Sequence, residues 1–272
     1  MHTASTPASA AARSVGDQIR TWRQHRRLSQ LDLASSADIS TRHLSCVETG
    51  RATPSRSMVM HLAERLAVPL RERNALLAAA GYAPLYRERP LSDPALAAAR
   101  AAVEQVLKAH EPWPALAVDR HWQMVSANAV LPLLLAGVAS FLLEPPVNVL
   151  RLSLHPEGAA PRIANLASWR AHVFHRLAQQ IEATADPVLQ ALLAELQGYP
   201  APPQDDPDAG DPQAPNAIVV PLKYRSEAGL LSFVSTTTVF GSPVDITLAE
   251  LALETFFPAD TATADALRRL AA

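Results

Sequence analysis

The stretch LSQLDLASSADISTRHLSCVETG, residues 28–50, carries the polar side chains whose spacing points most clearly to a chemistry in this chain. The apolar residues that would fasten two short helices across a tight turn are Leu33, Ala34, Ile39, Leu44 and Val47. The second helix would then expose Thr41, Arg42 and His43 in its first turn. A helix placed in this way enters the major groove of DNA N-terminus first, while the preceding helix crosses the phosphate backbone. The pattern therefore predicts hydrogen bonding to base edges.

Three side chains in this stretch have alternative interpretations. Arg42 could pair bidentately with a guanine, a contact worth ~1–3 kcal/mol of discrimination, or it could be a solvated surface charge. His43 could read a base, pack against its own domain or contact the DNA backbone. Glu48 fits a structural role, either as the partner of Arg51 or Arg56 or as a cap for nearby amides.

The charge of the chain is divided unevenly between its two halves. Residues 1–89 hold 13 Arg, no Lys and 7 Asp plus Glu, so their net charge is 13 − 7 = +6. The remaining residues hold 11 Lys plus Arg and 19 Asp plus Glu, which gives −8, and the two parts sum to −2. A basic first half is suited to a polyanion, because binding releases counterions without any reading of sequence. The acidic second half is not, so only the first half is expected to meet nucleic acid.

The same stretch resembles the phage-repressor-like (Xre-type) helix-turn-helix family. The matching positions are Gln30, Leu33, Ala34, Ile39, Ser40, Leu44, Glu48, Gly50 and Pro54. The DNA-contacting residues that the resemblance implies are Gln30, Ser40, Thr41, Arg42, His43, Thr49 and Arg51. Thr41, Arg42 and His43 would contact bases, and Gln30, at the positive end of its helix, would donate to a phosphate. Asp38 departs from the family, which often has glycine at this turn.

The elements that must position these residues are five short helices in residues 14–82. The expected helices are Val15–Arg26, one capped by Ser29, one capped by Ser40, one that restarts after Pro54-Ser55, and Arg71–Ala80. Residues 1–13 have no apolar run behind a basic start, so they predict a disordered leader and no signal peptide. Residues 83–93 predict a linker to a second domain.

Residues 94–272 alternate between helical and strand periodicity and predict an α+β domain with a small antiparallel sheet. The expected elements are a helix at Pro94–His110, two strands around an Asp119-Arg120 turn, an amphipathic helix at 163–181, a helix at Pro187–Gln197, a hairpin of Ile218–Arg225 and Leu230–Phe240, a strand at Leu251–Phe257 and a helix from Thr263. The Pro/Asp-rich residues 200–216 predict an exposed flexible loop.

The very apolar segment Val125–Leu150 raises the question of a membrane span, since its only charge is Glu144. A spanning helix needs about 20 apolar residues, and this segment is interrupted by polar residues and by the Pro145-Pro146 pair. We therefore expect a buried helix and no membrane partner. A single cysteine, Cys46, excludes an internal disulfide and fits a reducing cytoplasm.

The second domain resembles the MmyB-like ligand-binding domain, a PAS-like sensor that is joined to an Xre-type head in its family. The matching segments lie within residues 94–258 and include DPALAAARAAVEQVL, EPWPALAVDRHWQMVSANAV, NVLRLSLHPEG and ANLASWR. The resemblance implies an apolar pocket with a fatty-acid-like ligand, and no other cofactor is expected.

A long acyl chain needs a dry apolar wall and one or two polar groups at its mouth. The candidate wall residues are Trp122, Leu133, Leu134, Phe141, Trp169, Val173, Phe174, Phe233 and Phe240, each of which could equally be ordinary core. The candidate polar anchors are Asn128, Asn148, Arg151 and His172. Arg151 could bind a ligand carboxylate or pair with an internal Asp or Glu.

No constellation of catalytic residues is found in the sequence. His172 and His175 lie three apart on a predicted helix, but no carboxylate or cysteine spacing accompanies them as a metal site would require. We therefore expect no metal and no enzyme activity. The sequence predicts a DNA-binding regulator, a homodimer on a pseudo-palindromic operator because one head reads too few base pairs. The alternatives are an enzyme domain fused to the head, or a second domain that serves only dimerisation or a protein partner.

Overall fold

The computed structural model describes residues 13–200, 220–241 and 245–271. The chain forms two compact units, Met1–Arg87 and Glu88–Ala272, and the division falls inside the stretch 83–93 that was expected to be a linker. Apart from Arg13 and Pro200, the predicted leader 1–13 and the predicted flexible loop 200–216 lie outside the described residues.

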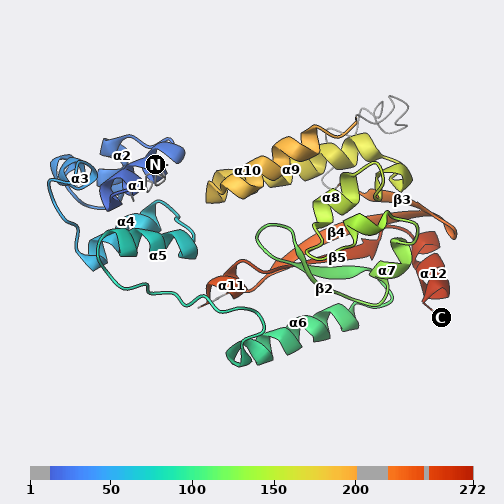
Figure 1. Ribbon diagram of the computed structural model, residues 1–272. Helices are drawn as coiled ribbons and strands as arrows, with labels where there is room; N and C mark the ends of the chain where they lie inside the picture. Colours follow the sequence, from blue (N-terminus) through green and yellow to red (C-terminus); the bar gives the residue numbers. More distant parts are fainter. Residues whose placement is uncertain (1–12, 201–219, 242–244, 272) are drawn as a thin grey trace, which may run out of the picture. The chain divides into compact units, whose positions relative to one another are not determined.

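The first unit consists of five short helices, which confirms the predicted helix-turn-helix domain (Figure 1). They are α1 (Val15–His25), α2 (Gln30–Ser36), α3 (Thr41–Glu48), α4 (Arg56–Arg65) and α5 (Leu70–Ala79). The first four each begin behind a serine whose hydroxyl accepts from the amide three residues further on, and these serines are Ser14, Ser29, Ser40 and Ser55. Such caps satisfy an amide that the helix itself leaves unpaired.

The core of the first unit fixes α3 against α1 and α2. Ile19, Leu33 and Leu44, one from each of these helices, are fully buried. Gly16 lets α1 approach the C-terminal end of α3 closely, because a Cβ there would lie 2.3 Å from the carbonyl oxygen of Val47. The exposed side of α3 is therefore held on a rigid support.

The second unit is built on a five-stranded antiparallel sheet with the order β2-β1-β5-β4-β3, which confirms the predicted α+β domain. Its strands are β1 (Ala115–Val118), β2 (Met124–Ala127), β3 (Leu222–Ser226), β4 (Gly229–Val239) and β5 (Ala252–Pro258). In the central strand β5, Glu254 pairs with Leu116 of β1 and with Thr237 of β4. These three residues share one face, because residues directly opposite each other across antiparallel strands point to the same side of a sheet.

Helices cover the two faces of this sheet with different cores (Figure 1). Helix α6 packs Val103 and Leu107 against Ala115 and Leu253 on one face. Helices α8 and α9 cover the other face, with α10 beside α9. The helical elements of this unit are η1 (Pro94–Leu96), α6 (Ala97–Ala109), α7 (Leu131–Leu134), η2 (Ser140–Leu142), α8 (Val149–Leu154), η3 (Ala160–Arg162), α9 (Leu166–Thr184), α10 (Pro187–Gln197), α11 (Ile246–Ala249) and α12 (Thr261–Leu270).

The prediction of one buried helix within Val125–Leu150 was wrong. The segment contains the end of β2, the four-residue helix α7 and the short helix η2. Gly137, with a φ of +80°, and the Pro145-Pro146 pair break the helical path, so apolar composition was a poor guide to conformation. No helix among the described residues is long and apolar enough to cross a membrane.

The long amphipathic helix starts later than predicted. α9 begins at Leu166 and not at Ile163, because η3 precedes it and Ile163 forms a β-bridge with Tyr224 of β3. The bridge joins this corner to the edge of the sheet, and both residues are buried.

Candidate functional sites

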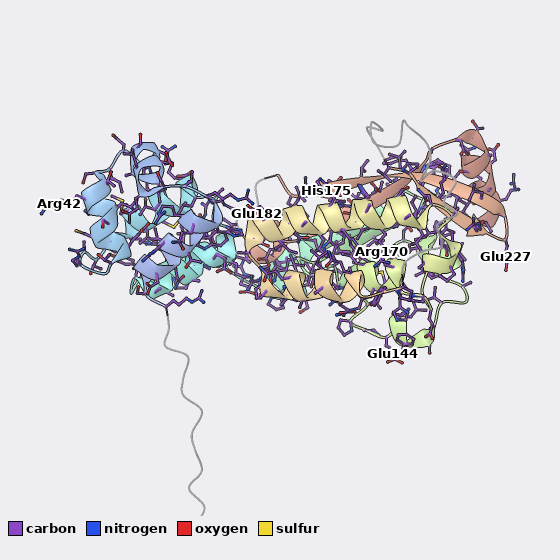
Figure 2. The ribbon with its side chains drawn as sticks, turned by 90° about the horizontal axis from the view of Figure 1, so that it is seen from above. Arg42, Glu144, Arg170, His175, Glu182 and Glu227 are labelled. Atoms are coloured by element: carbon purple, nitrogen blue, oxygen red, sulfur yellow. The ribbon has the colours of Figure 1, made fainter. Side chains whose placement is uncertain are left out.

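The first turn of α3 places three predicted reading residues together on an open surface. Arg42 and His43 are exposed and Thr41 is partly exposed, while Ser40 caps the helix by accepting from the amide of His43 at 3.1 Å. Figure 2 shows Arg42 pointing away from the ribbon into solvent. Since the opposite side of α3 buries Leu44, the arrangement suits a helix that presents its N-terminal residues to base edges.

A buried ion pair fixes the C-terminal end of α3. The Arg23 Nε and Nη2 donate to the two carboxylate oxygens of Glu48 at 2.7 and 2.9 Å. The partner of Glu48 is therefore Arg23 on α1, and the predicted pairing with Arg51 or Arg56 was wrong. Burial of the Glu48 carboxyl raises its pKa, but hydrogen bonds from Arg23 and Gln30 outweigh this and hold the pKa below its ordinary value.

Gln30 completes this cluster from the start of α2. Its Nε2 donates to the Glu48 Oε2 at 2.8 Å, which uses one of the two amide hydrogens of this side chain. Beyond α3, the Thr49 Oγ1 donates to the carbonyl of Ser45 at 2.7 Å and accepts from the Arg51 Nε at 3.1 Å. Both Thr49 and Arg51 are exposed, and they lie next to each other after the end of α3.

The second unit contains an apolar cavity of about 130 Å³ between the sheet and helices α8 and α9. Five of the thirteen candidate ligand-binding residues line it, namely Trp122, Leu134, Trp169, Val173 and Phe233. The remaining lining residues are Pro114, Leu116, Leu131, Leu135, Val149, Leu150, Leu152, Ser153, Ala159, Ile163, Arg176, Leu222, Tyr224, Glu254 and Phe256. The wall is thus drawn from the sheet, from α7, α8 and α9, and from the segments between them.

The three predicted anchors Asn128, Asn148 and Arg151 do not line the cavity. Asn128 is buried and donates to the carbonyls of Leu107 and Trp113, so it ties the end of β2 to the start of the unit. Asn148 caps α8 by accepting from two of its amides. Arg151 forms a two-bond pair with Glu195 of α10, both bonds 2.7 Å long. The internal pairing weighed for Arg151 is the arrangement found.

The other predicted residues lie outside the cavity for different reasons. Phe141 is 50% exposed on η2, and Phe240 packs on the opposite face of the sheet, with the cluster under α6. His172 stacks at 5.4 Å on Trp169 behind the wall. Burial and the neighbouring Arg176 lower the pKa of His172, which favours the uncharged ring. Leu133 is exposed, and Phe174 lies beneath the guanidinium of Arg170.

Sequence reasoning missed the charged pair in the cavity wall. The Arg176 Nη2 donates to the Glu254 Oε1 at 2.8 Å, and its guanidinium lies 5.0 Å from the ring centre of Trp122. Arg176 follows Trp169 and Val173 at helical spacing on the apolar stripe of α9. A charge that interrupts an apolar stripe is the signal that could have identified it.

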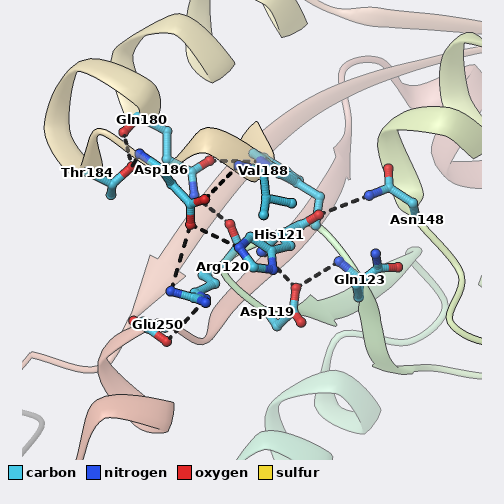
Figure 3. A network of polar contacts seen from close by, with 11 residues as sticks. Asp119, Arg120, His121, Gln123, Asn148, Gln180, Thr184, Asp186, Val188 and Glu250 are labelled. Carbon is cyan, nitrogen blue, oxygen red and sulfur yellow. Dashed lines mark hydrogen bonds and ion pairs between the residues drawn. The ribbon is translucent and has the colours of Figure 1, made fainter. Parts of the chain in front are cut away.

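Trp122 has an unusual backbone conformation, and its side chain is anchored by a hydrogen bond. Its φ of 64° is unusual for a bulky residue, and its indole donates to the Gln180 Oε1 at 2.8 Å. Figure 3 shows the polar network around this turn. The His121 Nε2 lies 2.9 Å from the Asp186 Oδ2, and the Arg120 Nε lies 3.8 Å from the Glu250 Oε2. Residues held in strained conformations concentrate at ligand sites, so this turn is consistent with a functional wall.

No group of three or more His, Cys, Asp or Glu that could hold a metal ion occurs in the part of the chain that the structure describes. The geometry therefore offers two sites, an exposed helix face in the first unit and an apolar cavity in the second.

Comparison with known families agrees with this division. A family model described as "MmyB-like transcription regulator ligand binding domain" matches residues 99–270, and one described as "Helix-turn-helix domain" matches residues 14–76. A search of curated proteins found no match.

Proposed function

This chain belongs to the transcription regulators with an MmyB-like ligand-binding domain, and from that premise we propose that it is a sequence-specific DNA-binding regulator controlled by a small apolar ligand. The observation that carries the proposal is the apolar cavity in a unit whose family is a ligand-binding one. The helix-turn-helix unit supplies the DNA-binding function, with Thr41, Arg42 and His43 as the readers.

A fatty-acid-like molecule, with an acyl chain as its apolar body, is the ligand class we propose. The cavity is lined almost wholly by apolar side chains, as a dry acyl site requires. Its volume of about 130 Å³ is similar to an engineered cavity of about 150 Å³ that binds benzene. A longer chain must therefore widen the cavity as it enters, and this movement gives the ligand a means of acting on the rest of the unit.

The route by which ligand acts on DNA binding runs through the sheet to α6. Leu116 of β1 faces the cavity, while its neighbours Ala115 and Ala117 face α6 on the other side of the sheet. Helix α6 begins at Ala97, shortly after the junction at Arg87–Glu88, so a shift of the sheet reaches the segment that leads to the first unit. In a homodimer, this shift would change the spacing of two heads across a pseudo-palindromic operator.

The test is DNA binding with and without an apolar ligand. Fluorescence anisotropy at one fixed salt concentration compares duplexes from the region upstream of the protein's own gene with scrambled duplexes of the same composition. We expect tighter binding to the upstream duplex, roughly 10³-fold or more for a specific operator. Equal affinity for both duplexes would refute sequence-specific regulation.

The alternative is that the second domain serves only dimerisation or a protein partner. Native mass spectrometry of the purified full chain distinguishes this alternative from ligand sensing. A co-purifying lipid supports the ligand-sensing proposal. If no lipid is retained and added acyl ligands leave operator affinity unchanged, the domain acts only as an interaction module.

A further inference from the structure

The charges in the cavity wall are already balanced. Among its lining residues only Arg176 and Glu254 are charged, and they bind each other with oxygen–nitrogen distances of 2.8 and 3.2 Å. Thr237 joins the pair by accepting from Arg176 and donating to Glu254, both at 2.8 Å. The side chain of Glu254 is only 5% exposed, so its charge is screened by Arg176 and hardly by water.

The two indole N–H groups and the tyrosine hydroxyl of the wall have partners as well. The Trp169 Nε1 donates to the Ser153 Oγ at 3.0 Å, and the Trp122 Nε1 donates to Gln180. The Tyr224 hydroxyl donates to the carbonyl of Leu134 at 2.5 Å. The indole and phenol donors of the wall therefore already have acceptors within the protein.

A free carboxylate would meet this wall unfavourably. To bind Arg176, it must displace Glu254 or share the guanidinium with it, which places a second carboxylate beside the buried carboxylate of Glu254. Like charges in such a site disfavour each other, and an unpaired buried carboxylate is costly. His172 does not line the cavity, and burial lowers the pKa of its ring, which disfavours a second cation there.

We propose that the cavity selects acyl ligands whose polar end is uncharged, such as an alcohol, an ester or an amide, and that Glu254 is the residue that rejects a free carboxylate. The inference rests on the proposed ligand-sensing function and narrows its ligand class. A hydroxyl or carbonyl group can hydrogen-bond to the edge of the Arg176–Glu254 pair without bringing a charge.

Arg162 provides the competing site for an anion. Its guanidinium has no carboxylate partner within the described residues, and it lies 6.0 Å from the ring centre of Tyr224. Its Nη1 donates to the carbonyl of Leu134 and to the Tyr224 hydroxyl, and its Nη2 donates to the carbonyl of Ala136. Arg162 does not line the cavity, so a carboxylate bound there would lie outside the wall.

The experiment compares the binding of 1-decanol and of sodium decanoate to the full chain at pH 7.5. Binding is detected by the change in tryptophan fluorescence, to which Trp122 and Trp169 contribute. The wild-type chain is expected to bind decanol at least about tenfold more tightly than decanoate. In Glu254→Gln, Arg176 loses its anionic partner, so decanoate affinity should rise by about tenfold or more while decanol affinity stays within about threefold. Glu195→Gln, which removes a carboxylate from the Arg151 pair outside the cavity, should leave both affinities unchanged.

The double variant Arg176→Gln/Glu254→Gln keeps the inference testable if the single variant is unstable. It removes both charges, so we expect it to bind decanol like wild type and to bind decanoate more tightly than Arg176→Gln, which keeps the Glu254 carboxylate. If wild type binds decanoate as tightly as decanol or more tightly, the inference is overturned and ligand sensing stands. Loss of decanoate binding in Arg162→Met would then locate the anion at Arg162. If neither ligand binds the wild type, the acyl-ligand function fails together with the inference.

Discussion

At the scale of the residue, Arg42 is the side chain on which sequence reading most depends. It is exposed in the first turn of α3 and has the guanidinium geometry that fits the O6 and N7 of guanine. Arg42→Ala should weaken binding to the specific duplex by about 1–3 kcal/mol, roughly 5- to 150-fold, and weaken binding to scrambled DNA far less. Anisotropy titrations with both duplexes measure the two effects.

The matched control for Arg42 is Arg65→Ala, which removes the same charge from an exposed position at the end of α4. It should lower both affinities slightly and equally, because it changes only the overall charge. If Arg42→Ala behaved in the same uniform way, Arg42 would be a phosphate contact and not a reader.

Glu48 is the second residue with a measurable consequence. Truncation by Glu48→Ala leaves Arg23 buried without its partner, which should destabilise the first unit by about 3–5 kcal/mol. Because the pKa of Glu48 lies below its ordinary value of 4.5 in the folded chain, protonation favours the unfolded state. The difference in the free energy of unfolding between wild type and Glu48→Ala should be fully present above pH 4.5. It should be lost as pH falls through the lower pKa that Glu48 has in the folded chain. Calorimetric melts across this pH range measure both effects.

The control for Glu48 is the double variant Arg23→Met/Glu48→Met, which replaces the pair with apolar side chains. It should recover most of the lost stability, since a buried ion pair is often replaceable by well-packed apolar groups. A double variant as unstable as Glu48→Ala would show that the pair has a specific structural role beyond charge neutralisation.

At the scale of the element, the turn between α2 and α3 takes the shape that a helix-turn-helix needs despite its unusual residue. Asp38 has a φ of 52°, in the left-handed region where glycine is at ease and aspartate is tolerated. Asp38→Gly relieves that strain at some cost in chain entropy, so we expect a net stabilisation of about 0.5 kcal/mol. Thermal unfolding of the two proteins measures the difference.

Asp38→Ala is the control for this turn, because it removes the carboxylate and keeps the Cβ atom. It should be no more stable than wild type. Equal stability of the glycine and alanine variants would mean that backbone strain at this position has no measurable effect.

The helices and strands could be predicted from the sequence where short-range features, such as caps and apolar spacing, determine them. The serine caps and the apolar spacing fixed the helices of the first unit, and α10 matches its predicted bounds. The segment after β2 could not be read in this way, because Gly137 and the proline pair override its apolar composition. Asn128 and Arg151 were predicted as polar anchors of the cavity, Arg151 because an arginine between two leucines needs a partner. Those partners are Trp113 and Glu195, both distant in the sequence and therefore visible only in the fold.

At the scale of the whole molecule, the two units must influence each other if the ligand controls DNA binding. Coupling between two sites is reciprocal, so a ligand that changes operator affinity by some factor must have its own affinity changed by the same factor when operator is bound. Couplings of this kind are typically about 5- to 150-fold.

We therefore expect decanol to change operator affinity and saturating operator to change decanol affinity by equal factors in the same direction. Anisotropy of labelled operator at several decanol concentrations gives the first factor, and decanol titrations of the operator-bound chain give the second. Phe233→Ala, which alters the cavity wall far from the first unit in sequence, should weaken decanol binding without changing operator affinity in its absence. Two factors of unequal size would show that decanol acts elsewhere than on a single coupled equilibrium. A factor of one in both directions would mean that the cavity binds its ligand without governing the helix that reads DNA.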